Sequence, residues 1–162
     1  MNLTGAQTQH ETTPTPYSWI DNADSFGRMV EGLKGADRLA LDTEADSLYH
    51  YYEKVCLLQI STAAETFVVD PLALRDLGLL ASIFADGKVE KVFHAAAYDI
   101  SCLSRDHAFT FMNLFDTHLA AHLLGYEQLG LSALLEKLLG VVHSKQRQRI
   151  RPERIEGNHI QQ

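Results

Sequence analysis

The order of the apolar segments constrains the fold of this chain more than any other feature. Three short apolar runs follow one another with short links, at Arg38–Glu44, Val55–Thr62 and Thr66–Asp70. Their length and their content of β-branched residues predict strands, and residues 63–65 predict a hairpin turn between the second and the third. Beyond these runs, strand-like and helix-like segments alternate. Adjacent strands followed by such alternation predict an α/β domain with a mixed β-sheet flanked by helices.

The remaining elements follow from apolar periodicity and from turn residues. Two further strands are predicted, at Val89–His94 and Phe111–Phe115. Five helices are predicted: one that begins at Asp24 or Ser25 and ends at Leu33, one from Pro71 to about Phe84, one at Tyr98–His107, one at Thr117–Leu124 capped by Asp116, and one at Leu131–Leu139 ended by Gly140.

The 162 residues suit one domain with a hydrophobic core. We expect a flexible leader at 1–18, the folded domain at 19–142 and a basic, disordered tail at 143–162, because the tail has only isolated isoleucines and no aromatic residue. The net charge of −7 argues against a general nucleic-acid coating protein. Residues 145–162 nevertheless carry five basic and two acidic side chains, so a polyanion could be bound locally.

The chain gives no sign of a membrane or secreted protein. No apolar run approaches the roughly 20 residues of a membrane-spanning helix, and the polar N-terminus lacks the layout of a secretory signal. Cys56 and Cys102 lie in apolar segments without ligand-pair spacing, which predicts buried free thiols. We therefore expect a cytoplasmic protein without a membrane partner, while its oligomeric state stays open.

The first candidate site residues are Asp42 and Glu44, at the end of the apolar run that begins at Leu39. Residues two apart on a strand point to the same face. Two neighbouring carboxylates repel each other unless a cation lies between them. The pair therefore indicates a Mg²⁺ or Mn²⁺ site, although an isolated pair of this kind can also be two solvated acids at a strand end.

The second candidate is Asp99, which follows the predicted strand Val89–His94 and a small-residue turn at 95–97. A carboxylate there can face one at the end of a neighbouring strand. Taken by itself, an aspartate at such a position is more often a helix cap or a first-turn acid.

Together these segments resemble the ribonuclease D-like family of DEDD 3′–5′ exonucleases. Five segments match in order: Asp42-Thr43-Glu44, Val55–Ser61, Lys91–Asp99, Phe115–Gly125 and Leu131–Val141. The resemblance implies a ribonuclease H-like fold and an enzyme that hydrolyses phosphodiester bonds at the 3′ end of single-stranded nucleic acid, with RNA as the expected substrate. It also implies two divalent cations, Mg²⁺ or Mn²⁺.

The resemblance also implies roles for individual residues. Asp42, Glu44 and Asp99 would be the catalytic, metal-binding acids, with Asp42 bridging the two cations. Four further residues are candidates for substrate contact: Thr43, His94, Tyr98 and Lys145. Strand packing, a hydrogen-bonded histidine and a core tyrosine are the structural alternatives for the first three.

One departure from the family pattern bears on activity. The family has a third motif in which a Tyr or His precedes a final Asp on a helix, but here the last tyrosine is Tyr126 and the last aspartate is Asp116. We therefore expect an incomplete C-terminal helical part and impaired activity. The alternatives are a catalytically inactive nucleic-acid-binding or interaction fragment of the same fold and, less well matched, a phosphohydrolase of another fold.

Overall fold

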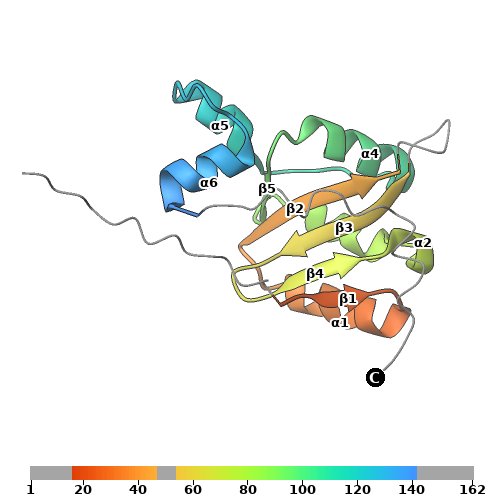
Figure 1. The fold of residues 1–162 in the computed structure, drawn as a ribbon. Coiled ribbons are helices and arrows are strands. Elements are labelled where there is room, and N and C mark those ends of the chain that lie inside the picture. The colour runs from red at the N-terminus through yellow and green to blue at the C-terminus, as the bar shows by residue number, and fades with distance from the viewer. Residues whose placement is uncertain (1–15, 47–53, 142–162) are drawn as a thin grey trace, which may run out of the picture. The chain divides into compact units, whose positions relative to one another are not determined.

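The computed structural model describes residues 16–46 and 54–141 (Figure 1). The chain divides into two compact units. The larger unit, Thr15–Glu127, contains the β-sheet and its helices. Within the smaller unit the described residues are 128–141, which form the helix α6 (Leu131–Leu139).

A mixed six-stranded sheet organises the larger unit, as the sequence predicted. Its strands lie in the order β1-β4-β3-β2-β5-β6. β2 pairs antiparallel with β3, and β3 with β4, whereas β1 with β4, β2 with β5 and β5 with β6 are parallel pairs. The bounds are β1 Ser18–Ile20, β2 Arg38–Ala45, β3 Val55–Ser61, β4 Thr66–Val69, β5 Glu90–Phe93 and β6 Leu114–Asp116.

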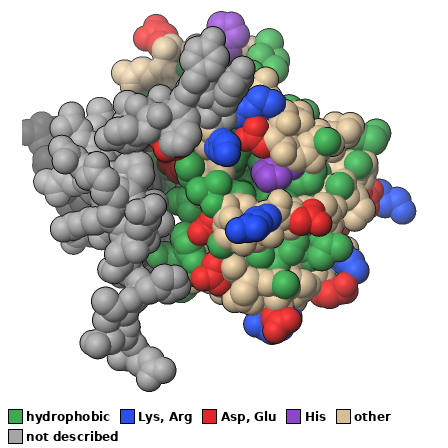
Figure 2. All heavy atoms as spheres, turned by 90° about the vertical axis from the view of Figure 1, so that its right-hand side faces the viewer, with side chains coloured by type: hydrophobic (Ala, Val, Ile, Leu, Met, Phe, Trp, Pro, Cys, Tyr) green, Lys and Arg blue, Asp and Glu red, His purple; other side chains and the backbone are tan. Residues whose placement is uncertain are grey.

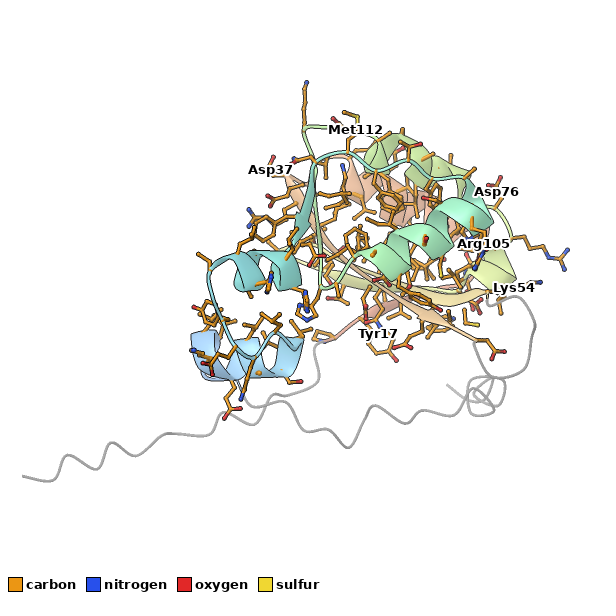
Figure 3. All side chains as sticks on the ribbon, turned by 90° about the horizontal axis from the view of Figure 1, so that it is seen from above. Tyr17, Asp37, Lys54, Asp76, Arg105 and Met112 are labelled. Atoms are coloured by element: carbon orange, nitrogen blue, oxygen red, sulfur yellow. The ribbon has the colours of Figure 1, made fainter. Side chains whose placement is uncertain are left out.

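Only one face of the sheet is deeply covered within the larger unit. Along β2, burial alternates strictly, so that Leu39, Leu41 and Thr43 are buried while Ala40, Asp42 and Glu44 are exposed. The buried side joins α1 (Ala23–Leu33) and α4 (Ala97–His107) in one hydrophobic cluster, and side chains fill the space between these layers (Figures 1 and 3). Each fully buried leucine there stabilises the fold by about 1.5–3 kcal/mol.

The helix α1 confirms the predicted apolar stripe. Its buried residues are Phe26, Met29, Val30 and Leu33. The cap differs from the prediction, because the Asn22 side chain accepts the Ser25 N–H, so that the helix begins before Asp24. Asn is as good a cap as Asp or Ser, and the sequence alone could not choose among neighbouring candidates.

The single helix predicted from Pro71 to Phe84 is wrong. The segment forms α2 (Pro71–Leu74), a 3₁₀ turn (Gly78–Leu80) and α3 (Ala81–Phe84). Arg75 has a positive φ of 62°, and the Asp76 carboxylate accepts the Gly78 N–H at 2.7 Å. This side-chain-to-backbone bond competes with helix continuation and breaks the segment after one turn.

Two edge strands also differ from the predictions. Ser18, placed in the leader, is the first residue of β1, a strand too short to show alternation. β6 begins at Leu114 rather than at Phe111, because Phe111 packs among Phe84, Phe93 and Phe109 instead of joining the sheet. Pairing with β5 begins only after Asn113, which has a positive φ of 55°.

The last two helices follow the prediction closely. Asp116 caps α5 (Thr117–Leu123), and α6 ends at Gly140 with a positive φ of 68°, a conformation that glycine adopts without strain. Cys102 is buried as predicted, whereas Cys56 is only half-buried. Among the described residues, none of the helices has the length and apolarity needed to cross a membrane.

Candidate active site

Asp42 and Glu44 lie where β2 runs beyond its parallel neighbour. The pairing of β2 with β5 covers only Arg38–Ala40, while the antiparallel pairing with β3 continues to Ala45. Both acids are on the exposed face of the sheet. The predicted arrangement of two carboxylates on one face is therefore confirmed. A register shift between Glu44 and Ala45 marks the end of regular pairing and bends the strand directly after the second acid.

Asp99 reaches the same end of β2 from the first turn of α4. It is only 8% exposed, and its Oδ1 accepts hydrogen bonds from the Thr43 N–H at 3.1 Å and from the Thr43 Oγ1 at 2.5 Å. Asp99 thus accepts a backbone hydrogen bond from β2 at a position where β2 no longer pairs with β5. The fold brings together two segments 56 residues apart, which no local pattern could show.

The three acids raise the local negative charge. Burial, followed by repulsion from Asp99 and then from Glu44, raises the pKa of Asp42 to about 6, although a hydrogen bond from the Thr43 backbone opposes the shift. The Asp42 side chain reaches solvent, so the nearby protein and the neighbouring charges act together. A site that disfavours its own ionised carboxylate gains free energy when a cation binds.

His94 follows β5 at the same edge of the sheet. Its Nδ1 lies 2.9 Å from the Thr117 Oγ1, which donates its one proton to the Phe93 carbonyl at 3.0 Å. Nδ1 is therefore the donor in the first of these bonds. The His94 and His118 rings meet edge-on at 5.6 Å. Burial and then the nearby His118 hold the pKa of His94 below its usual value, against the attraction of Asp116.

Asp116 does more than cap its own helix. Its Oδ1 accepts from the N–H groups of His118 and Leu119 in α5 and from Ala95, while Oδ2 accepts from Ala96. Although burial opposes the shift, these four bonds keep the pKa of Asp116 below its usual value. The sequence indicated the cap but not the two bonds to residues 95 and 96, which only the pairing of β5 with β6 makes possible.

The candidate substrate residues have different surroundings. Thr43 is buried and engaged with Asp99, so its side chain holds an acid in place. Tyr98 is 49% exposed at the start of α4, where an aromatic ring could stack on a base. His94 is bound to Thr117. Lys145 lies outside the described residues.

The donor set suits a hard divalent cation, because Asp42, Glu44 and Asp99 offer only carboxylate oxygens. Among residues 16–46 and 54–141, however, no three His, Cys, Asp or Glu side chains converge closely enough to hold a metal ion. The charges act on one another, yet one oxygen of Asp99 is committed to Thr43. The acids therefore fit a cation in their chemistry, whereas their side chains do not converge on one point in the described part of the structure.

Two neighbours on β3 were missed by the sequence analysis. Gln59 lies opposite Asp42, and Leu57 lies opposite Glu44. Side chains in directly opposite positions lie on the same face of the sheet, about 5 Å apart. The predicted turn at residues 63–65 sets the register of β3 with β4 and not that of β2 with β3, so no local signal identified either residue. Gln59 thus places an amide beside the candidate acids.

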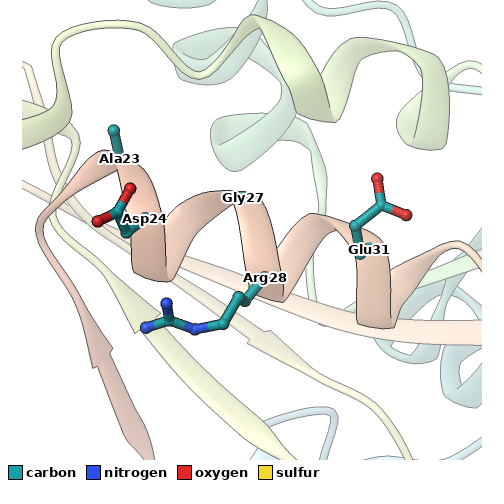
Figure 4. A pocket seen from close by; sticks show the side chains of 5 residues that line it. All are labelled: Ala23, Asp24, Gly27, Arg28 and Glu31. Carbon is teal, nitrogen blue, oxygen red and sulfur yellow. The ribbon is translucent and has the colours of Figure 1, made fainter.

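One hollow lies on the described surface away from the candidate acids. Figure 4 shows a shallow hollow along the outside of α1, lined by Ala23, Asp24, Gly27, Arg28 and Glu31. All five belong to one helix face, so the hollow is not enclosed by other elements. On the face in Figure 2, acidic and basic side chains lie beside one another without a continuous basic surface.

Comparison with known proteins also indicates a 3′–5′ exonuclease domain. A family model described as 3′–5′ exonuclease matches residues 17–154. The exosome complex exonuclease RRP6 of Saccharomyces cerevisiae is 38% identical over 139 residues, covering 83% of this chain and 19% of the yeast protein. This chain therefore spans less than a fifth of that relative.

Solved structures share the fold. The catalytic core of RRP6 from Trypanosoma brucei superimposes with a TM-score of 0.79 at 30% identity, covering 93% of this chain and 43% of that one. Escherichia coli RNase D, described as an exoribonuclease involved in structured RNA processing, gives a TM-score of 0.76 at 23% identity over 88% of this chain and 40% of its own. These similarities confirm the ribonuclease H-like α/β fold that the sequence predicted.

Proposed function

Because this chain belongs to the 3′–5′ exonuclease family, in its ribonuclease D-like branch, we propose that it carries the cation-binding core of an enzyme that removes nucleotides from RNA 3′ ends. Metal-dependent hydrolysis is characteristic of this family. The assignments of individual residues, of two cations and of RNA as the substrate belong to this proposal.

The observation that carries the proposal is the meeting of β2 and α4. Asp42 and Glu44 share the exposed face at the end of β2, and Asp99 is bound to the residue between them. Burial, together with repulsion from Asp99 and Glu44, raises the pKa of Asp42, and perturbed carboxylates of this kind are frequent at functional sites.

Each acid has a distinct part in the proposed mechanism. Two cations would supply an activated water and charge stabilisation at the leaving 3′ oxygen. Asp42 would bind both cations, Glu44 the one that activates water, and Asp99 the other. Thr43 holds Asp99 in position through two hydrogen bonds. Tyr98 would stack on the terminal base, and His94 Nε2 would accept a hydrogen bond from the nucleotide.

We propose that a polypeptide of these 162 residues is a weak nuclease. It has no aspartate after Asp116 and no tyrosine after Tyr126, so the third family motif has no counterpart in it. A positioned acid–base group typically contributes about 10²–10⁴-fold to rate. A water-activating cation held by two carboxylates instead of three would also be bound less tightly and placed less accurately.

A binding role without catalysis is the second candidate function. It is favoured by one observation: within the described part of the chain the acids do not converge into a formed metal site. The basic segment that contains Lys145 would then contact phosphates. We propose a cytoplasmic location for either role.

The two functions separate in a degradation assay. RNA and DNA oligonucleotides with a labelled 5′ end are incubated with Mn²⁺ and this chain, with its Asp99→Asn variant, or with a chain extended by a third-motif helix from a relative. We expect slow stepwise shortening of RNA by this chain, none by Asp99→Asn, and at least about 10²-fold faster shortening by the extended chain.

The same samples report binding. If residues 145–162 contact phosphates, their deletion should flatten the dependence of RNA affinity on salt concentration. RNA binding without shortening in any Mn²⁺ sample, including the extended chain, would establish the non-catalytic role. Shortening by 1–162 at the rate of the extended chain would mean that another residue replaces the final aspartate.

A further inference from the structure

The turn that leads from β5 into α4 is strained and lacks a local cap. Ala95 has a positive φ of 62°, which a residue with a Cβ rarely adopts. Such a conformation is unfavourable and persists only when surrounding contacts hold it. Ala96 is the N-cap residue of α4, and its methyl group cannot accept a hydrogen bond. The entry into this helix therefore depends on contacts from elsewhere.

Asp116 supplies these contacts from the end of β6. Its two oxygens accept the Ala95 N–H at 3.0 Å and the Ala96 N–H at 2.9 Å. A left-handed residue followed by a right-handed one points two successive N–H groups into a concavity that binds anions. Here the bound anion is a side chain of the same protein, and it also caps α5.

A second pair of bonds fixes the strand side of the same turn. The Thr117 hydroxyl donates to the Phe93 carbonyl at 3.0 Å and lies 2.9 Å from the His94 Nδ1. Asp116 and Thr117 together hold every residue from Phe93 to Ala96 against the start of α5. We call these two residues the β6 clamp.

The clamp lies one helical turn from a candidate catalytic acid. Asp99 is three residues beyond Ala96, in the first turn of α4, and a helix transmits a displacement of its first residue along its rigid backbone. The Thr43 N–H and hydroxyl both donate to Asp99 Oδ1, so a shift of the start of α4 would change both bonds. From this geometry we infer that Asp116 is a positioning residue, which sets where Asp99 stands against β2 by holding the Ala95–Ala96 turn.

The inference rests on the proposed function only where it concerns a cation; the placement of Asp99 against Thr43 can be measured alone. The test variant is Asp116→Asn. Asparagine has one acceptor oxygen and caps helices as well as aspartate does. It can therefore keep the bonds that Oδ1 accepts from α5 and from Ala95, whereas the amide group that replaces Oδ2 cannot accept from the Ala96 N–H. The matched control is Asp70→Asn, because Asp70 caps α2 through the Leu72 and Ala73 N–H groups and does not touch the turn.

Two readouts are needed. In amide hydrogen exchange followed by NMR, Asp116→Asn should speed exchange at Ala96 and also at Thr43, whose N–H donates to Asp99, by about 10-fold or more. In calorimetric titration with Mn²⁺, the same variant should bind about 10-fold more weakly, in line with the loss typical when a group supporting a metal ligand is removed. Asp70→Asn should change neither readout.

The outcomes are separable. Unchanged exchange at Thr43 in folded Asp116→Asn would overturn the inference, since Asp116 would then only cap α5. If Mn²⁺ binds no version of the chain, the proposed function fails while the Thr43 amide still decides the positioning role. Should Asp116→Asn not fold, Thr117→Val must speed Thr43 exchange and Thr117→Ser, which keeps the hydroxyl, must restore it; no difference between these two would also overturn the inference.

Discussion

The aspartates at the ends of β6 and β2 lie in opposite electrostatic environments. At the end of β6, Asp116 accepts four backbone N–H bonds, and its pKa lies below the usual value despite burial. At the end of β2, burial and then the nearby carboxylates of Asp99 and Glu44 raise the pKa of Asp42 to about 6. Amide donors stabilise an ionised carboxylate within the protein itself, whereas a carboxylate that lies near other carboxylates is stabilised when a cation binds. The contrast identifies the candidate site more clearly than either residue does alone.

The largest expected effect is on the β6 side. Asp116→Ala should lower the free energy of unfolding by about 3 kcal/mol, because a helix cap is lost and the N–H groups of exposed Ala95 and buried Ala96 lose their acceptor. Urea denaturation at pH 7 measures the loss. The matched substitution Asp70→Ala removes only a helix cap and should cost about 1 kcal/mol.

The pH dependence sharpens this prediction. Since folding lowers the pKa of Asp116, its ionised form stabilises the native state above the unfolded-state pKa, and that stability is lost as the pH falls through the folded-state value. The difference between the wild type and Asp116→Ala should therefore shrink in acid. A difference that grows as the pH falls would contradict the assignment of Asp116 as an ionised acceptor.

A smaller effect is expected at Thr43, the β2 residue that donates two hydrogen bonds to Asp99. Thr43→Val keeps the β-branched shape but removes the hydroxyl that donates to Asp99. A hydrogen bond to a charged group typically contributes about 1.5–3 kcal/mol. Because the Thr43 N–H bond to Asp99 is retained, we expect the free energy of unfolding to fall by about 1.5 kcal/mol. Thermal or urea unfolding gives the value, and Thr43→Ser, which retains the hydroxyl, should recover most of it.

The smallest effect has the opposite sign. Asp42→Asn should raise the stability of the cation-free protein by about 1 kcal/mol at pH 8, a modest value because the side chain is exposed and screened by solvent. Folding raises the pKa of Asp42 from 3.8 to about 6, so native stability falls as the pH rises through this interval and the penalty is complete above it.

The experiment is urea unfolding in a chelator at pH 4 and pH 8. The gain in stability from Asp42→Asn should be present at pH 8 and absent at pH 4. Added Mn²⁺ should stabilise only the wild type, so that the wild type becomes the more stable of the two proteins. If Asp42→Asn is less stable than the wild type at pH 8 without metal, the β2 acids are not in mutual repulsion, and the contrast with Asp116 disappears.

Local patterns in the sequence determined most elements of this fold. The alternation of Leu39 to Glu44 predicted both a strand and the common face of Asp42 and Glu44, because side chains on a strand repeat every two residues. The spacing of Phe26, Met29, Val30 and Leu33 likewise predicted the buried face of α1. The family motifs added Asp99 as a partner.

The tertiary structure decided what depends on segments far apart in the chain. The break after α2 comes from the Asp76 side chain bonding to the backbone of Gly78, and the late start of β6 comes from Phe111 packing on Phe84 and Phe93. Periodicity reports which face is apolar but not which neighbour will compete for it.

The same distinction holds for the candidate site. The sequence alone determined which acids are present and that two of them share a face. Only the tertiary structure placed Asp99 on Thr43 and tied Asp116 to the turn at Ala95 and Ala96. Both contacts arise from parallel pairing of β5, with β2 on one side and β6 on the other. Such pairing joins distant segments through backbone hydrogen bonds that leave no periodic trace in the side chains.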